Sequence, residues 1–529
     1  MSLFLAIAFW LLADAPPARQ TIPISTKSEE ARREYLAGRT LVENLRNTEA
    51  IPHFREALRL DPDFALAHLA LSNVSPTATE FQSERAAAVK SMSQATEGEQ
   101  LLIRAAEAGA AAKPLEARAL FTRLAALYPN DARAQMQLAL NEFGAQEFDK
   151  AIEGLSRAIA IEPGFAAPYN QRGYARRAVR DFKGAEEDFK SYIRLLPDDP
   201  NPYDSYAELL LATGRYDESI EAYKRALGVR SSFIASRLGI MTNLVYLGRT
   251  REALAAMNDY RKAARNQAER VGGFYQAAAI YVSLDDPKKA ATELEKSLQS
   301  NESIRDYAAA AFDAATLART YLEYGALAEA KKWERRSEEL SAAAKQPPAV
   351  AEATELGNRY NRIRILLADH KLGAARGEIA KYRADVAARR FTQGIRRASE
   401  LEGMLALAED RWDDAIAALK KANLQDPYNL YRLALAYEGA RQTEEAKSYY
   451  KQTVDLNQLL NLNYEFVRNK ARVRLMGLRA LASLEQRGLR VGEKLPTFAL
   501  NDQHGRRQTL DTLAGPNGLV VLLVRSADW

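Results

Sequence analysis

A fixed spacing of 34 residues is the feature that most restricts how this chain of 529 residues can fold. The recurring pattern is an Ala, an aromatic residue or Leu four positions later, an apolar residue three further on, and then Pro. It begins at Ala117, Ala151 and Ala185, keeps its register at Ser219, and occurs again at Ala50 and Ala415. A constant period of this length predicts stacked helical hairpins, each of which buries its apolar face only against its neighbours.

The segment upstream of each pattern supports the same fold. A large residue is followed four positions later by a small one, as in Tyr169 and Gly173, Tyr203 and Ala207, and Phe274 and Ala278. Where two helices cross closely only Gly or Ala fits, and the aromatic ring fills the space between turns. The Pro cannot continue a helix and therefore ends each unit. We expect a mainly α protein built as a helical-hairpin solenoid.

These residues resemble the tetratricopeptide repeat (TPR), which implies a right-handed superhelix of about ten or eleven units from Ala31 to Leu460. The register is lost between Leu71 and Gly98, where an additional helix-like stretch lies. An Ala- and Pro-rich segment divides the expected array. The expected domains are a TPR block at 31–340, a linker at 341–355, and a second block at 356–486 that ends in a capping helix from Tyr464 to Gln486.

The resemblance implies a protein or peptide partner on the concave surface, which the first helix of each unit lines. The unit from Pro200 offers Asn201 and Asp204, so a clamp for a C-terminal carboxylate is not expected. That these side chains only pack or are solvated remains the alternative. The residues that repeat position places in the groove are Met136, Leu140, Phe143, Asn170, Tyr174 and Arg177.

The N-terminus has the pattern of a signal peptide. Ten apolar residues from Leu3 to Leu12 precede Ala13-Asp14-Ala15, with small residues where a signal peptidase cleaves. The run is too short to cross about 30 Å of hydrocarbon. We expect a signal peptide at 1–15, a linker at 16–30, export to the periplasm and no membrane span in the mature chain. The alternative is a cytoplasmic protein whose N-terminal helix packs on the first repeat.

Composition excludes much chemistry. The chain has no Cys and four His far apart, so we expect no disulfide, no metal site and no cofactor. No phosphate-binding loop or nucleophile motif is present. The net charge is +5, and the stretch from Arg359 to Arg397 holds eleven basic and three acidic residues without an aromatic ladder. We interpret this stretch as a solvated face, with an acidic partner as the alternative, and expect no nucleic acid.

The last forty residues differ in composition. A turn at Asn501–Gly505 separates two short strand-like segments, and the continuous apolar run Leu519–Val524 is typical of a strand buried on both faces. This region resembles the start of the redoxins, thioredoxin-like proteins of the peroxiredoxin AhpC/TSA type. In this sequence the matching motif residues are Gly492, Pro496, Phe498, Leu500, Ala527, Asp528 and Trp529. The resemblance implies an incomplete α/β thioredoxin-like segment at 489–529, whose reactive Cys would follow Trp529.

Two functions follow from these patterns. The first is a non-catalytic TPR scaffold that binds a protein or peptide outside the cytoplasm. The second is a truncated form of a TPR-fused thiol- or selenol-dependent oxidoreductase, in which a UGA codon for selenocysteine would follow Trp529. Because the chain has no Cys, we expect it to have no peroxidase or disulfide-reductase activity.

Overall fold

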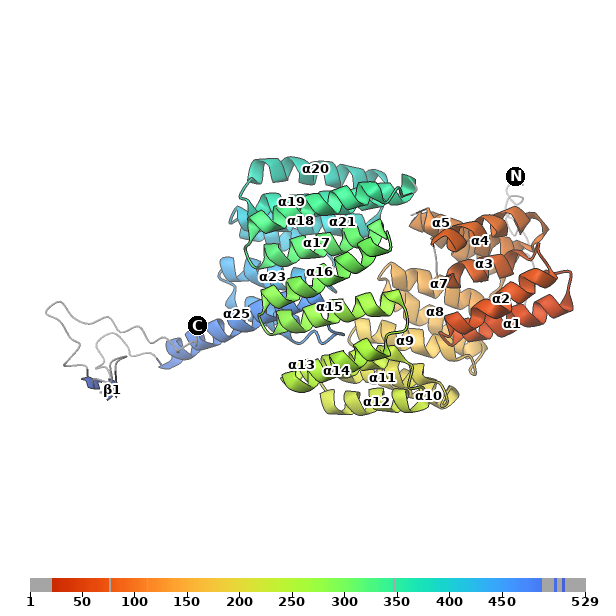
Figure 1. Ribbon diagram of the computed structural model, residues 1–529, viewed down its shortest axis with the longest axis horizontal. Helices are drawn as coiled ribbons and strands as arrows, with labels where there is room; N and C mark the ends of the chain where they lie inside the picture. The colour runs from red at the N-terminus through yellow and green to blue at the C-terminus, as the bar shows by residue number, and fades with distance from the viewer. Residues whose placement is uncertain are drawn as a thin grey trace, which may run out of the picture. The chain divides into compact units, whose positions relative to one another are not determined.

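The repeat array is made of helical hairpins that follow one another along the chain. A computed structural model describes residues 21–75, 78–111, 113–346, 348–487, 499–501 and 507–509. Helices α1 to α24 form twelve hairpins, and each odd-numbered helix packs on the even-numbered helix that follows it (Figure 1). The array is therefore a helical-hairpin solenoid, as the 34-residue period predicts.

The first helices of the hairpins form one face of the array, which we call the first-helix face. They are α1 (Glu29–Glu43), α3 (Ala65–Val74), α5 (Glu97–Ala110), α7 (Ala132–Gly144), α9 (Ala166–Ala178), α11 (Pro200–Ala212), α13 (Ile234–Tyr246), α15 (Gln267–Ser283), α17 (Tyr307–Glu323), α19 (Pro348–Ala368), α21 (Thr392–Ala408) and α23 (Pro427–Gly439). The second helices are α2 (Asn47–Leu60), α4 (Ala78–Ser91), α6 (Pro114–Leu127), α8 (Phe148–Ile161), α10 (Phe182–Leu195), α12 (Tyr216–Val229), α14 (Thr250–Ala263), α16 (Pro287–Ser303), α18 (Leu327–Ala343), α20 (Leu372–Ala388), α22 (Trp412–Leu419) and α24 (Thr443–Val454). A short 3-10 helix, η1 (Met92–Gln94), precedes α5, and α25 (Leu462–Arg487) follows the last hairpin.

Close helix crossings explain the spacing of small and large residues. A Cβ atom added to Gly173 would lie 2.8 Å from the ring of Phe189, and one added to Gly239 would lie 2.0 Å from the ring of Tyr223. Both rings are fully buried. Each glycine therefore leaves the space that an aromatic ring of the paired or preceding helix occupies, which is the steric reason for the pattern.

The period lengthens in the second half of the array. Helices α15 to α18 have 17 residues each, whereas α7 to α14 have 13 or 14. The added residues amount to about one helical turn per helix. The 34-residue pattern fades there because each unit has become longer, while the hairpin architecture continues.

Two expected irregularities are helical in the structure. The stretch between Leu71 and Gly98 contains α4, the second helix of its hairpin. The segment 341–355, expected to be a linker, is mostly helix, because α18 extends to Ala343 and α19 begins at Pro348. Pro is well tolerated in the first turn of a helix, and here Pro348 starts α19.

The chain divides into two compact units, Met1–Arg472 and Val473–Trp529. In the second unit, β1 (Ala499–Asn501) pairs in antiparallel fashion with β2 (Arg507–Thr509), so that Leu500 lies opposite Gln508. This hairpin lies where the sequence places a turn between two strands. The described part of this unit does not show a thioredoxin-like sheet. The predicted strand Leu519–Val524, the motif residues Gly492, Pro496, Phe498, Ala527, Asp528 and Trp529, and the predicted signal peptide at 1–15 lie outside the described residues.

Candidate binding groove

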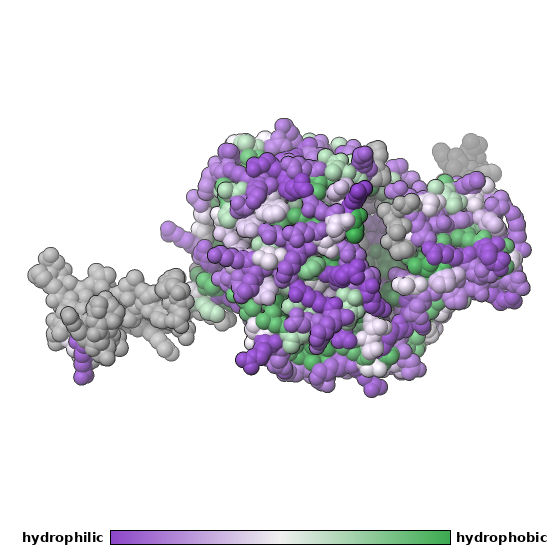
Figure 2. All heavy atoms as spheres, viewed as in Figure 1, coloured by the Kyte–Doolittle hydropathy of each residue, from purple (hydrophilic) through white to green (hydrophobic). Residues whose placement is uncertain are grey.

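An apolar groove lies on the first-helix face at the start of the array. Its cavity has a volume of about 360 Å³, and helices α1, α3, α5, α7 and α9 contribute to its lining together with the chain segment that precedes α1. Across the molecule, hydrophilic residues cover most of the face seen in Figure 2, with smaller apolar patches among them. The residues of the groove used below are Ile22, Ile24, Tyr35, Arg39, Val42, Glu43, Leu66, Leu69, Ala70, Asn73, Leu102, Asp131, Arg133, Met136, Gln137, Leu140, Ala167 and Gln171.

Each first helix presents one stripe of side chains to this groove. On α3 the stripe is Leu66, Leu69, Ala70 and Asn73, which follow the i, i+3, i+4, i+7 spacing of one helix face. On α7 the same spacing gives Arg133, Met136, Gln137 and Leu140. The walls are therefore mainly apolar, with single polar groups at fixed positions along them.

Arg133 is the main charged group of the groove. Its guanidinium donates to both carboxylate oxygens of Glu43, at 2.7 and 2.9 Å, and to Glu162 at 2.9 Å. It also lies over the ring of Phe165, 4.4 Å from the centroid. Burial disfavours its charge, but the hydrogen bonds and charges of Glu43 and Glu162 outweigh burial, so the pKa of Arg133 is raised. The ion pairs of Arg133 with Glu43 and Glu162 fix one polar position in an otherwise apolar wall.

Two further polar groups, those of Tyr35 and Arg39, lie beside the ion pairs of Arg133. Burial raises the pKa of Tyr35 to about 12, so its hydroxyl stays neutral near pH 7. The Nε of Arg39 is buried and makes no hydrogen bond in the described part of the chain, but it lies 3.6 Å from Oε1 of Glu43 as an ion pair.

The segment before α1 runs along the groove and is held through its main chain. The amide of Ile22 donates to Asp131 at 2.8 Å, the amide of Ser25 donates to Glu99 at 2.7 Å, and the amide of Lys27 donates to Asp61 at 2.9 Å. Asp131 precedes α7, Glu99 lies in the first turn of α5, and Asp61 precedes α3. Carboxylates at three points along the first four hairpins thus bind backbone amides of one non-helical segment.

Sequence reasoning missed these three carboxylates. Asp131 is recognisable as an N-cap, because its side chain accepts from the amides of Arg133 and Ala134. Thr96 and Glu99 form a capping box. Both patterns predict the start of a helix, and neither indicates that the same carboxylate also binds another segment of the chain.

The predicted groove residues separate into two groups. Met136 and Leu140 line the groove. Phe143 instead packs edge-to-face on Phe148, with ring centroids 5.4 Å apart. Asn170 is buried, and its Oδ1 has no hydrogen-bond partner among the described residues.

The two remaining predicted residues bind the next hairpin. The hydroxyl of Tyr174 donates to Ser205 on α11 at 3.2 Å, and Arg177 pairs with Glu208 on α11 at 3.1 Å. The guanidinium of Arg177 also covers the ring of Tyr174 at 4.7 Å. These residues join α9 to α11, and the groove residues of α9 are Ala167 and Gln171.

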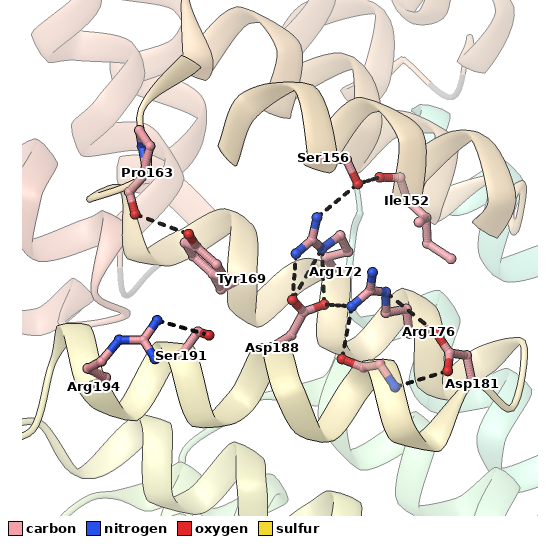
Figure 3. Close-up of polar contacts among 11 residues, drawn as sticks. Ile152, Ser156, Pro163, Tyr169, Arg172, Arg176, Asp181, Asp188, Ser191 and Arg194 are labelled. Carbon is pink, nitrogen blue, oxygen red and sulfur yellow. Dashed lines mark hydrogen bonds and ion pairs between the residues drawn. The ribbon is translucent and has the colours of Figure 1, made fainter. Parts of the chain in front are cut away.

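A buried ion-pair cluster fixes α9 in its place. Arg172 and Arg176 on α9 both bind Asp188 on α10, at 2.7 and 3.0 Å, and Arg172 also donates to Ser156 on α8 (Figure 3). Asp188 is only 2% exposed. The cluster therefore ties three consecutive helices together behind the groove and has a structural role.

In the parts of the chain that the structure describes, no group of three or more His, Cys, Asp or Glu side chains is arranged to hold a metal ion. Within the same residues, no helix combines the length and the apolar character that crossing a membrane requires.

Models of the tetratricopeptide repeat match residues 35–76, 170–232 and 428–457. These ranges fall on α1 to α3, α9 to α12, and α23 to α24. The chain contains tetratricopeptide repeats. The hairpins between the matched ranges continue the same helical array, as the packing of consecutive helices indicates.

The chain is also similar to known proteins. Over 153 residues it is 23% identical to anaphase-promoting complex subunit 3 of Schizosaccharomyces pombe, a match that covers 28% of this chain and 22% of that protein. The chain therefore spans about a fifth of that relative. A TPR protein from Parabacteroides merdae aligns over 51% of this chain and 93% of its own, with 15% identity and a TM-score of 0.33. YrrB, described as a TPR protein with an unusual peptide-binding site, aligns over 34% and 92%, with 18% identity and a TM-score of 0.25.

Proposed function

We propose that this chain is a non-catalytic TPR scaffold that binds a protein or peptide partner in the groove of α1 to α9. The observation that carries the proposal is the apolar cavity of about 360 Å³ on the first-helix face. A concave site with mainly apolar walls and a few fixed polar groups is typical of a ligand-binding site.

The chain's own N-terminal segment indicates the conformation that the ligand adopts. Ile22 and Ile24, two positions apart, both line the groove, while main-chain amides of the segment donate to carboxylates at helix ends. Alternate side chains facing one wall are typical of extended chain. We infer that the partner contributes an extended peptide with apolar residues at alternate positions, which would bury its side chains against Leu69, Leu102 and Leu140.

A peptide-display selection tests this proposal. Purified full-length chain would be presented to a phage library of short random peptides, and the affinity of the enriched peptides would be measured by fluorescence anisotropy. In the variant Leu140→Asp we expect at least tenfold weaker binding, because a carboxylate would replace part of the apolar wall. Retained helicity by circular dichroism would exclude unfolding as the cause.

The matched control is Leu115→Asp on α6. Leu115 is 52% exposed and lies outside the groove, so this variant receives the same charge without changing the cavity. Peptides that bind Leu140→Asp as tightly as the unchanged chain, or that are lost only in Leu115→Asp, would contradict the assignment.

We also propose that the protein acts outside the cytoplasm, with 1–15 removed as a signal peptide. The support is the apolar run Leu3–Leu12 followed by Ala13-Asp14-Ala15. Cell fractionation and N-terminal sequencing of the mature protein test this location. An intact N-terminal Met in the cytoplasmic fraction would overturn it in favour of the cytoplasmic alternative.

The second candidate function is a TPR-fused thiol- or selenol-dependent oxidoreductase, of which 489–529 would be the opening segment. The observation that favours it is the pairing of β1 with β2, which lies between the redoxin-like residues Phe498 and Ala527. The coding sequence downstream of Trp529 tests this candidate. An in-frame UGA or Cys codon followed by a thioredoxin-like sequence would support it, and their absence would exclude it.

A further inference from the structure

The first-helix face of the middle hairpins is already covered by another part of the same chain. Residues 456–470, which join α24 to α25 and form the first turns of α25, contact α13, α15 and α17. These helices are more than 130 residues away in the sequence. We call residues 456–470 the return segment.

Apolar contacts provide most of this interface. Leu460, Leu462, Phe466 and Val467 of the return segment are buried in one cluster with residues of α13, α15 and α17. The ring of Phe466 packs edge-to-face on Tyr324, which follows α17, with centroids 5.5 Å apart. Burial of this many large side chains is typical of an amphipathic helix bound in a groove.

Tyr246, the last residue of α13, is the polar centre of the interface. Its hydroxyl donates to the carbonyl of Gln458 at 2.8 Å, and the guanidinium of Arg468 lies 3.9 Å from its ring centroid. Arg468 is 3% exposed and donates to the carbonyl of Leu456 at 2.7 Å, which holds the bend before α25. A guanidinium held over an aromatic ring and away from water is attracted electrostatically by the face of the ring.

Hydrogen bonds at both ends fix the register of the segment. The amide of Leu460 donates to Thr242 on α13 at 3.0 Å, and Lys470 pairs with Glu323 on α17 at 2.6 Å. A helix that only capped the last hairpin would bury its apolar side against α23 and α24. The return segment also binds the first-helix face of hairpins far upstream, in a cluster that includes Tyr428 of α23.

We propose that the face of α13, α15 and α17 is a second binding site, for an amphipathic helix, and that the return segment is its intramolecular ligand. While the segment is bound, this site is closed to partners, and the groove of α1 to α9 stays open. The ligand that fits is a helix carrying an apolar pair and an Arg in the order of Phe466, Val467 and Arg468.

A synthetic fluorescent peptide with the sequence of 455–472 tests the proposal on the full chain. The double variant Phe466→Ala with Arg468→Ala weakens the internal ligand and leaves the receiving face unchanged. We expect it to bind the peptide at least tenfold more tightly than the unchanged chain does. A peptide carrying the same two substitutions should not bind. The control is Val473→Ala with Met476→Ala, because these α25 side chains are 70% and 63% exposed. This control should bind the peptide with the same affinity as the unchanged chain.

A cleavage experiment separates a ligand from a structural cap. A protease site inserted after Asp455 would be cut in the folded full-length protein, and size-exclusion chromatography would follow the two fragments. We expect the C-terminal fragment to stay bound and to be displaced by excess peptide, while the array keeps its helicity. Unfolding of the array on cleavage or displacement, or equal peptide affinity in the double variant and the unchanged chain, would overturn the proposal.

Discussion

Replacing Gly239 with Ala tests the steric basis of the repeat. The added Cβ would lie 2.0, 2.2 and 2.4 Å from three atoms of the Tyr223 ring, which is fully buried. An ordinary contact requires about 3.4 Å or more, so the ring or the helix must move by roughly 1.4 Å in a close-packed interior. Overpacking of this kind costs about 1–3 kcal/mol, and the higher helix propensity of Ala returns about 0.5–1 kcal/mol. We expect a net loss of about 1–2 kcal/mol in the free energy of unfolding.

Urea unfolding followed by circular dichroism measures this loss, and two variants check its cause. Gly228→Ala is the matched control, because its added Cβ meets nothing within 4 Å and should leave stability unchanged or raise it by up to about 1 kcal/mol. Adding Tyr223→Leu to Gly239→Ala should recover part of the loss, since neighbouring substitutions are not additive. If Gly239→Ala is as stable as the unchanged chain, the close crossing of α12 and α13 is wrong.

Three other perturbations have defined outcomes. Burial raises the pKa of Asp204 to about 7, so its contribution to stability is complete below about pH 4 and is lost as pH rises through 7. The variant Asp204→Asn should therefore have the same melting temperature as the unchanged chain at pH 4 and a higher one at pH 8. Equal melting temperatures at pH 8 would contradict this prediction. Glu99→Ala removes the acceptor of the Ser25 amide, and hydrogen exchange in 21–28 should rise, whereas Glu97→Ala should leave it unchanged, because Glu97 pairs with Arg123 instead. Asp188→Asn leaves two partly buried arginines without their carboxylate partner and should cost about 1–3 kcal/mol in urea unfolding, so a loss below about 1 kcal/mol would argue against the cluster.

The hairpin architecture was predictable because it is encoded locally. The spacing from Ala117 to Ala185 repeats the same steric requirement in each unit, and the structure places fully buried side chains at these positions. The pattern was lost after Gln267 because the helices gain about one turn there, so that α15 and α17 begin 40 residues apart, at Gln267 and Tyr307. A search at a constant period cannot follow a change in helix length.

The groove was predictable only in part. The predicted residues Met136 and Leu140 line the cavity, whereas on α9 the lining residues are Ala167 and Gln171, next to the predicted Asn170. Because each residue advances a helix by about 100°, an error of one position turns a side chain from the groove toward the neighbouring helix. The carboxylate of Glu99 and the guanidinium of Arg468 acquire their roles from segments distant in sequence, and no local pattern encodes those contacts.

The contacts of the return segment also determine the order in which this chain can fold. A stack of hairpins can grow one unit at a time, because each unit needs only its neighbour. The hydrogen bond between Leu460 and Thr242 joins residues that are 218 positions apart in the sequence. The two groups can meet only after the hairpins between them have formed. During synthesis the N-terminal hairpins emerge first, and the segment that covers α13 to α17 emerges late. Until then the apolar face of these helices is exposed, so the nascent array has an interval in which a chaperone or another nascent chain can reach it.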